Sequence, residues 1–229
     1  MFISISRCFQ VLLAVWLLAA CGTAPGPRLE TSRREVLRKA EARGLVEVRK
    51  AVPGIRTDLR YATAENVTGR PLYPKDMPCL LRASTARRLR QAQEQLARQG
   101  LGLCIWDAWR PLEAHERLYG KGRSTGLFLN PQHGWSRHCG GVSVDVTLVD
   151  SRGRPLPMPT GFDEASGATA SFAVPVDETV RKNLRALQAA MSAAGFQALP
   201  GEWWHFDDLE FLYHPVPAFY GRELGIHIE

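Results

Sequence analysis

The sequence predicts a single α+β domain in which a central antiparallel sheet is flanked by helices. Its composition, with 45% hydrophobic and 23% charged residues, is that of a soluble globular protein. Helical patterns come early in the chain whereas the later strands cluster, which favours α+β over a doubly wound parallel sheet. About 200 residues remain once the N-terminal segment is set aside, and one domain covers that length.

Helix-forming segments are recognised by their capping residues and by the glycines that follow them. We predict helices over residues 32–43, 84–99, 111–119 and 180–194. The clearest is 84–99, because Ser84 or Thr85 suits its N-cap and Gly100 occupies the position after its last turn. Pro111 fits the first turn of the next helix, where its missing N–H costs no hydrogen bond.

Strand-like segments are expected over residues 45–52, 57–61, 101–106, 142–149 and 202–207. Alternation along 142–148 sets a continuous apolar face opposite Ser143, Asp145 and Thr147. Residues 151–175, between this strand and the last helix, are rich in proline and glycine. Loops of that length in a compact domain are more often functional than idle.

The N-terminus has the pattern of a bacterial export signal. Arg7 precedes an apolar stretch that is too short to span a bilayer comfortably, and Ala19 and Ala20 precede Cys21 as in the lipobox of lipoproteins. We expect the cell envelope, with a lipid anchor on the periplasmic side of the inner or outer membrane. A plain signal peptide or an uncleaved anchor is the alternative. The expected division is a signal peptide (1–20), lipidated Cys21 with a flexible tether (21–31) and a folded domain (32–229).

Charge and cysteine content argue against two classes of site. The formal net charge is +6, but basic and acidic residues are interleaved, as in 33–41, so we expect no nucleic-acid partner. Beyond the N-terminal segment the cysteines are Cys79, Cys104 and Cys139. A disulfide between Cys79 and Cys104 and three free buried thiols are both open. The chain has no C-x-x-C pair, which argues against a zinc site built from thiolates.

Histidines and carboxylates gather in two short segments of the sequence. Asp145 lies mid-strand on a polar face, where a desolvated carboxylate needs a partner. His138 and His205 with Asp145 would offer a zinc ion two imidazole nitrogens and a carboxylate oxygen, leaving a fourth position for water. Glu202, near His205, could then take a proton from that water. The alternative is that each histidine is a hydrogen-bonded core residue.

These two segments also carry a family resemblance. SRHCGGVSVD (residues 136–145) together with EWWH (202–205) resembles the paired signature of the D-alanyl-D-alanine dipeptidases, which include the vancomycin-resistance dipeptidases. Further similarities cover the motifs DLRYAT (58–63), NVTGRP (66–71), WDAWRP (106–111) and MPTGFD (158–163). These matching segments occur in the family's order, and the resemblance covers about residues 45–215. The resemblance identifies 32–229 as a zinc D,D-dipeptidase domain.

The resemblance implies a metal site and a proton-transfer residue. His138, Asp145 and His205 would bind one Zn²⁺ ion per chain. Glu202 would act as general base toward water and then as general acid toward the leaving amine.

It also implies three residues around the substrate. Arg110 would stabilise the oxyanion as the scissile carbonyl becomes tetrahedral, although the residue alone would also suit a surface position at a helix start. Asp163 would pair with the free ammonium of the substrate, and Ser136 would lie near the dipeptide. The family usually has alanine at the position of Ser143, so ligand orientation or rate is expected to differ here. Cys139, beside a ligand, is expected to point away from the metal.

The expected reaction is hydrolysis of D-Ala-D-Ala to two D-Ala in cell-wall peptide turnover or recycling. One alternative is a D,D-carboxypeptidase or endopeptidase that uses the same chemistry on longer peptidoglycan stem peptides. The other is a non-catalytic module that keeps the zinc fold to bind wall fragments. Glu202 and Arg110 argue against that module, because binding alone needs neither a base nor an oxyanion donor.

Overall fold

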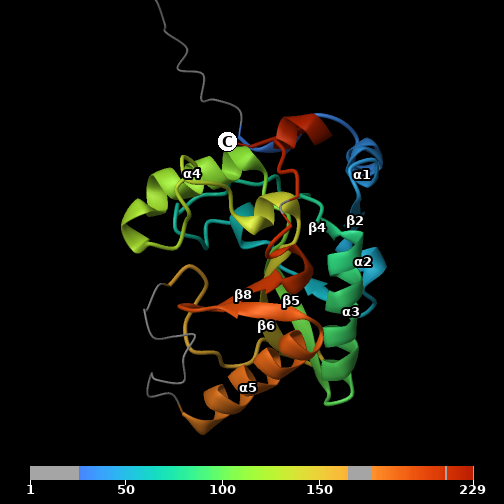
Figure 1. The fold of residues 1–229 in the computed structure, drawn as a ribbon, viewed down its shortest axis with the longest axis vertical. Helices are drawn as coiled ribbons and strands as arrows, with labels where there is room; N and C mark the ends of the chain where they lie inside the picture. The colour runs from blue at the N-terminus through green and yellow to red at the C-terminus, as the bar shows by residue number, and fades with distance from the viewer. Residues whose placement is uncertain (1–25, 165–176, 215, 229) are drawn as a thin grey trace, which may run out of the picture.

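The computed structural model describes residues 26–164, 177–214 and 216–228 (Figure 1). The predicted signal peptide, Cys21 and the first part of the predicted tether lie outside the described residues. The helices are α1 (Arg33–Glu41), α2 (Val48–Ala51), α3 (Ala83–Ala97), α4 (Leu112–Gly122) and α5 (Glu178–Ala193). Among the described residues, no helix has the length and hydrophobicity to span a bilayer.

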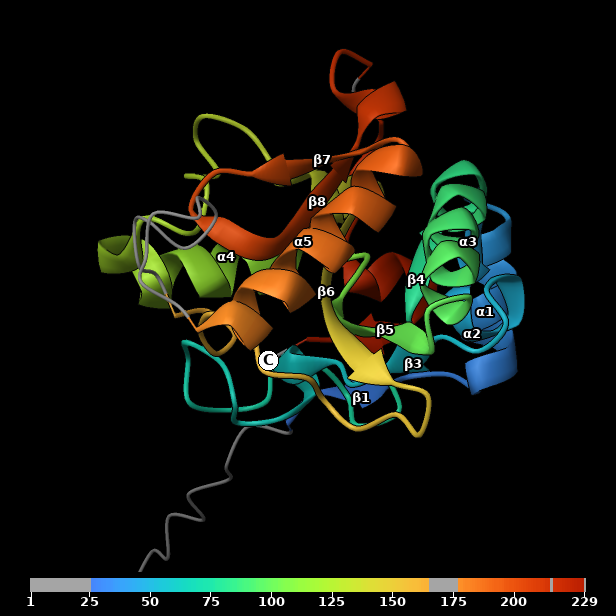
Figure 2. The same ribbon diagram turned by 90° about the horizontal axis from the view of Figure 1, so that it is seen from below.

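A five-stranded sheet of order β3-β5-β6-β8-β7 forms the centre of the molecule. Its strands are β3 (Arg56–Thr57), β5 (Leu101–Asp107), β6 (Ser143–Asp150), β7 (Phe196–Leu199) and β8 (Glu202–Asp208). All pairs are antiparallel except the short edge pair β3–β5, which is parallel. Helices α3 and α5 pack against each other and against the sheet, burying the first hydrophobic core (Figure 2). The mixed α and β domain predicted from the sequence is confirmed.

Two small sheets close the second half of the molecule. One pairs β2 (Leu45–Glu47) with β4 (Leu80–Arg82), and the other pairs β1 (Arg28–Leu29) with β9 (Ile226–His227). A second core gathers the apolar side chains of α1, α4, β2 and β9. The last residues of the predicted flexible tether are therefore folded, because the backbone of β1 bonds to the C-terminal strand and Leu29 packs against this core.

Helix boundaries follow the predicted caps in part. Ser32 caps α1 by accepting a hydrogen bond from the backbone N–H of Glu35 at 3.2 Å. The predicted cap of α3 at Ser84 or Thr85 is wrong, since the helix begins at Ala83 directly after β4. Thr85 is instead wholly buried, and its hydroxyl donates to Asp208 at 2.7 Å. A tertiary contact thus uses the hydroxyl that a cap would have used.

The strand predictions fail where a segment is short. Only the first three residues of 45–52 form a strand, and residues 48–51 form the single helical turn α2, which Val52 ends. Val48 and Val52, one turn apart, are both buried. Residues 57–61 divide between β3 and a 3-10 turn over Arg60–Ala62. Strand β7 was not predicted from the sequence; it has four residues and only its first side chain is buried.

Strand β6 positions the site, and its predicted alternation is confirmed. Val144, Val146 and Leu148 enter the core shared with α5. Asp145 points to the opposite face and pairs with His205 in the register of β6 against β8. The centre of the sheet is therefore the floor of the site.

Candidate metal centre and active site

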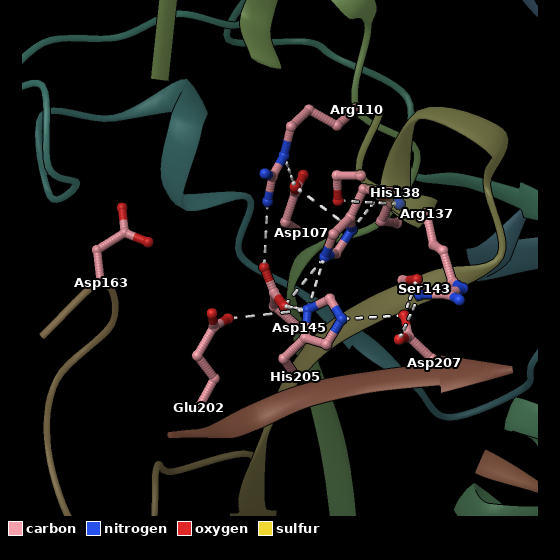
Figure 3. Close-up of polar contacts among 12 residues, drawn as sticks. Asp107, Arg110, Arg137, His138, Ser143, Asp145, Asp163, Glu202, His205 and Asp207 are labelled. Atoms are coloured by element: carbon pink, nitrogen blue, oxygen red, sulfur yellow. Dashed lines mark hydrogen bonds and ion pairs between the residues drawn. The ribbon is translucent and has the colours of Figure 1, made fainter. Parts of the chain in front are cut away.

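Three side chains from separate elements meet at the centre of the sheet. His138 comes from the 3-10 helix η3 (Arg137–Gly140), Asp145 from β6 and His205 from β8 (Figure 3). The His138 Nε2 atom is 3.1 Å from both Asp145 Oδ1 and His205 Nδ1, and the latter two atoms are 3.0 Å apart. All three residues are buried. Among the described residues, these three form the group of histidine, cysteine and carboxylate side chains that lie close enough together to bind one metal ion.

The turn between η3 and β6 brings His138 over the strand. Ser136 caps η3, and its hydroxyl oxygen accepts from the backbone N–H of His138 at 3.4 Å. Gly141 ends η3 in the left-handed region, with φ of 72°. A Cβ at Gly141 would lie 2.7 Å from Leu45 Cδ2, so both the dihedral and the space require glycine.

Hydrogen bonds at the outer ring nitrogens decide which nitrogen of each histidine faces the cluster. His138 Nδ1 lies 2.7 Å from the Ala108 carbonyl oxygen and must donate its proton there. His205 Nε2 donates to Asp207 Oδ1 at 3.0 Å. In the neutral tautomers, His138 Nε2 and His205 Nδ1 therefore carry lone pairs that point toward the Asp145 carboxylate.

Three lone-pair acceptors that face one another at this spacing repel unless a proton or a metal cation lies between them. The donor set of two imidazoles and one carboxylate, all buried, suits zinc. Their separations of 3.0–3.1 Å are close to the spacing of about 3.3 Å between ligands of a tetrahedral zinc ion. Three protein ligands leave one position open, as in catalytic rather than structural zinc sites.

Glu202 stands beside this triangle without belonging to it. Its Oε2 atom is 3.9 Å from His205 Nδ1. In a regular strand, residues three apart face opposite sides, but the pairing of β7 with β8 shifts register between Ala198 and Leu199. Burial raises the pKa of Glu202 to about 7, against the lowering effect of His205. A carboxyl with such a pKa can accept and return a proton at neutral pH.

Arg110 is buried beside the triangle, next to Asp145. Its Nε donates to Asp107 Oδ2 at 2.8 Å, and its Nη2 is 3.5 Å from Asp145 Oδ2 (Figure 3). The guanidinium also lies over the Tyr61 ring, at 5.1 Å from the centroid. The residue is 4% exposed, which excludes the surface position at a helix start.

Asp163 approaches from the loop after β6 and stands apart from the triangle in Figure 3. Its Oδ1 accepts from the Tyr61 hydroxyl and its Oδ2 from the Val67 backbone N–H, both at 3.1 Å. Burial raises the pKa of Asp163 to about 6. It has a φ of 59°, an uncommon conformation for a residue other than glycine, which these two hydrogen bonds hold in place.

One cavity of about 560 Å³ unites these groups. Its lining includes each site residue predicted from the sequence except Cys21, which lies outside the described residues: Arg110, Ser136, His138, Asp145, Asp163, Glu202 and His205.

Comparison with known proteins agrees with this geometry. The sequence pattern of the family described as D-ala-D-ala dipeptidase matches residues 41–122 and 126–219. The chain belongs to this family. As a member it is a metallopeptidase.

Characterised relatives cover most of the domain. The chain is 31% identical over 174 residues to the D-alanyl-D-alanine dipeptidase of Escherichia coli, covering 76% of this chain and 89% of the relative. It is 31% identical to that of Streptomyces coelicolor, covering 68% and 86%. It is 28% identical to that of Enterococcus faecalis, covering 73% and 91%.

Several residues that support this peptidase site were missed from the sequence. Asp107 receives hydrogen bonds from Arg110 and from the Tyr73 hydroxyl, at 2.8 and 2.9 Å. Asp207 accepts a hydrogen bond from the Ser143 hydroxyl at 2.5 Å and another from His205 Nε2. Both could have been identified from their spacing in the sequence. Asp107 lies three residues before Arg110, and Asp207 lies two residues after His205 and therefore on the same face of the strand.

The cysteines of the described domain play no part in the metal site of this peptidase. Cys79, Cys104 and Cys139 are free and buried, so no disulfide joins Cys79 to Cys104 in the described domain. Burial raises the pKa of the Cys139 thiol to about 12. Cys139 does not line the cavity that holds its neighbour His138.

Proposed function

We propose that this chain is a zinc-dependent dipeptidase that hydrolyses D-Ala-D-Ala to two molecules of D-Ala. The observation that carries the proposal is the buried triangle of His138, Asp145 and His205, with Glu202 near His205 and Arg110 near Asp145. The names of the relatives support the choice of substrate.

Glu202 and Arg110 divide the chemistry of peptide hydrolysis. Zinc held by the triangle would polarise the scissile carbonyl and lower the pKa of water to about 7. A Glu202 carboxylate oxygen takes the proton from the attacking water and then delivers it to the amine nitrogen as the C–N bond breaks. Arg110 donates to the carbonyl oxygen as negative charge develops on it, an interaction that is stronger in the transition state than in the substrate.

Asp163 restricts the substrate at its amino end. Its carboxylate, already oriented by Tyr61 and Val67, would pair with the free ammonium of the dipeptide. A long stem peptide has no free amine beside the bond that is cut, so this pairing selects dipeptides. Ser136 lines the same cavity, near the metal ligands, and would contact the dipeptide.

We further propose that the N-terminal segment directs this activity to the cell envelope. Lipidated Cys21 would anchor the enzyme on the periplasmic side of the inner or outer membrane, where it meets dipeptide released by wall turnover. This location favours a role in recycling of wall-derived D-Ala-D-Ala over a role in antibiotic resistance. Fractionation tests it: the wild type should sediment with membranes and a Cys21→Ser variant should not. A cytosolic wild type with an intact N-terminus would exclude the anchor.

Hydrolysis assays on the purified, zinc-loaded protein test the proposed reaction. D-Ala-D-Ala, N-acetyl-D-Ala-D-Ala and a muramyl pentapeptide are compared, with metal content measured on the same sample. Cleavage of the free dipeptide alone, by protein holding about one zinc per chain, is expected for three protein ligands and an open position. Cleavage of the blocked or longer substrates would assign a carboxypeptidase, and zinc without cleavage would assign a binding module.

A further inference from the structure

Three exposed apolar side chains line one part of the active-site cavity, which we call its apolar mouth. In the described part of the chain, the exposed large apolar side chains are Leu129, Trp135, Leu199, Leu209 and Tyr213. The first three line the active-site cavity, with exposures of 48%, 37% and 36%. Scattered exposed apolar side chains are ordinary, but a group that shares one concave surface indicates binding of an apolar ligand group.

Two separate segments carry this apolar mouth. Leu129 and Trp135 belong to the loop after α4, and Leu199 ends β7 at the turn into β8. Residues of both segments line the same cavity.

The loop side of the mouth is held in a defined position by His115. This histidine of α4 is wholly buried, and its Nε2 donates to the Leu129 carbonyl oxygen at 2.9 Å. Its ring meets the Trp135 indole edge-on, with centroids 5.8 Å apart. Leu129 and Trp135 are thus placed by a core residue rather than left as a free loop tip.

The apolar mouth lies next to Glu202 and apart from Asp163. Trp135 directly precedes Ser136, and Leu199 pairs in the sheet with Glu202, the proton donor to the leaving amine. Asp163, which would hold the substrate ammonium, also lines a separate cavity with Val67, whereas Leu129 and Trp135 also line another cavity that does not include Asp163. A side chain in the apolar mouth would therefore belong to the C-terminal residue of the dipeptide.

The cavity is also large for a dipeptide of two alanines. Its volume of about 560 Å³ lies within the range of about 300–1,000 Å³ that holds drug-sized ligands. The methyl group of a C-terminal alanine reaches little of the apolar lining, whereas a branched or aromatic side chain would displace water from it.

We propose that Leu129, Trp135 and Leu199 form a subsite for a bulky apolar side chain on the C-terminal residue of the substrate. The preferred substrates are then D-Ala-D-X dipeptides in which X is a D-amino acid such as leucine. This inference rests on the proposed dipeptidase function and specifies its substrate class.

Steady-state kinetics of the zinc-loaded full chain test the subsite. kcat/KM for D-Ala-D-Leu is expected to exceed that for D-Ala-D-Ala by about 10-fold, the lower range for added methylenes in an apolar pocket. D-Leu-D-Ala should show no such gain, because its side chain lies on the amine side. Leu129→Ser and Leu199→Ser should each lower the ratio of D-Ala-D-Leu to D-Ala-D-Ala by about threefold or more.

Leu209→Ser is the matched control, since Leu209 is exposed to 46% but does not line the cavity. It should leave the ratio and both rates unchanged. Cleavage of D-Ala-D-Ala without preference for D-Ala-D-Leu overturns the subsite and leaves the proposed function standing. A preference that survives in both Leu129→Ser and Leu199→Ser also overturns the subsite. Absence of cleavage of either dipeptide overturns the proposed function together with the subsite.

Discussion

At the residue scale, the site separates groups that bind the metal from a group that moves a proton. The ligand atoms of His138, Asp145 and His205 face one another closely enough to bind one ion, whereas the nearest Glu202 carboxylate oxygen is 3.9 Å from His205 Nδ1. The two kinds of residue should therefore respond differently to substitution.

Glu202→Ala should retain about one zinc per chain and lower kcat at least about 100-fold, the lower range for loss of a general base. His138→Ala, in contrast, should lose both metal and activity, because a ligand is removed. Metal analysis and kinetics on the same preparations provide the comparison. Loss of zinc from Glu202→Ala would instead place that residue among the ligands.

The acid side of the pH profile should report Glu202. Burial raises its pKa to about 7, and only the deprotonated form accepts a proton, so kcat/KM should fall as the pH falls through that pKa. A bound zinc ion adds positive charge nearby, so the holoenzyme limb should lie at or below pH 7. Asp163, whose pKa burial raises to about 6, contributes in the same direction. A profile flat from pH 5 to 8 would contradict both assignments.

Asp207 should tune metal affinity without touching the metal. Its carboxylate fixes the His205 tautomer and is itself oriented by the Ser143 hydroxyl. Asp207→Ala should weaken zinc binding by about 10–100-fold, and Ser143→Ala should weaken it less. Competition with a chromophoric chelator measures this directly. Equal affinity in Asp207→Ala and the wild type would remove Asp207 from the support of His205.

At the scale of elements, the turn from η3 into β6 controls the geometry of the site. Gly141 and Gly100 share a φ of 72°, but a Cβ at Gly100 meets no atom within 4 Å. Comparing alanine substitutions at the two glycines therefore separates the cost of the left-handed backbone conformation from the cost of the steric contact with Leu45.

Gly100→Ala should lower the free energy of unfolding by about 1 kcal/mol, the cost of the left-handed conformation. Gly141→Ala should lower it further and also weaken zinc binding, because Leu45 or η3 must shift. Urea unfolding of both variants, with chelator competition, checks the difference. Equal destabilisation by the two substitutions would show that the Leu45 contact is unimportant.

Element prediction succeeded where the pattern was long and failed where tertiary contacts compete. Strand 142–149 and helix 84–99 have enough periodic residues for their type and buried face to follow from the sequence. Thr85 was assigned to a cap, but its hydroxyl binds Asp208 on a distant strand. No local pattern contains that partner, because the two residues come together only when α3 packs on the sheet.

At the scale of the whole molecule, the site lies between two hydrophobic cores that pack on either side of it. The first core lies between the sheet and helices α3 and α5, and the second joins α1 and α4 to the chain ends. Arg110 comes from the start of α4 and His205 from β8, so the reaction centre lies where the two halves meet.

The sequence by itself determined the residue types of the site, the strand face of Asp145 and the family, because these depend on local order along the chain. Only the tertiary structure decided which nitrogen of each histidine faces the metal position, since Ala108 and Asp207 supply the outer hydrogen bonds. It also decided the partners of Arg110 and Asp163, and it brought Leu129 and Leu199 into the lining of one cavity. Such contacts join segments far apart in the chain, and packing of the sheet rather than local pattern brings them together.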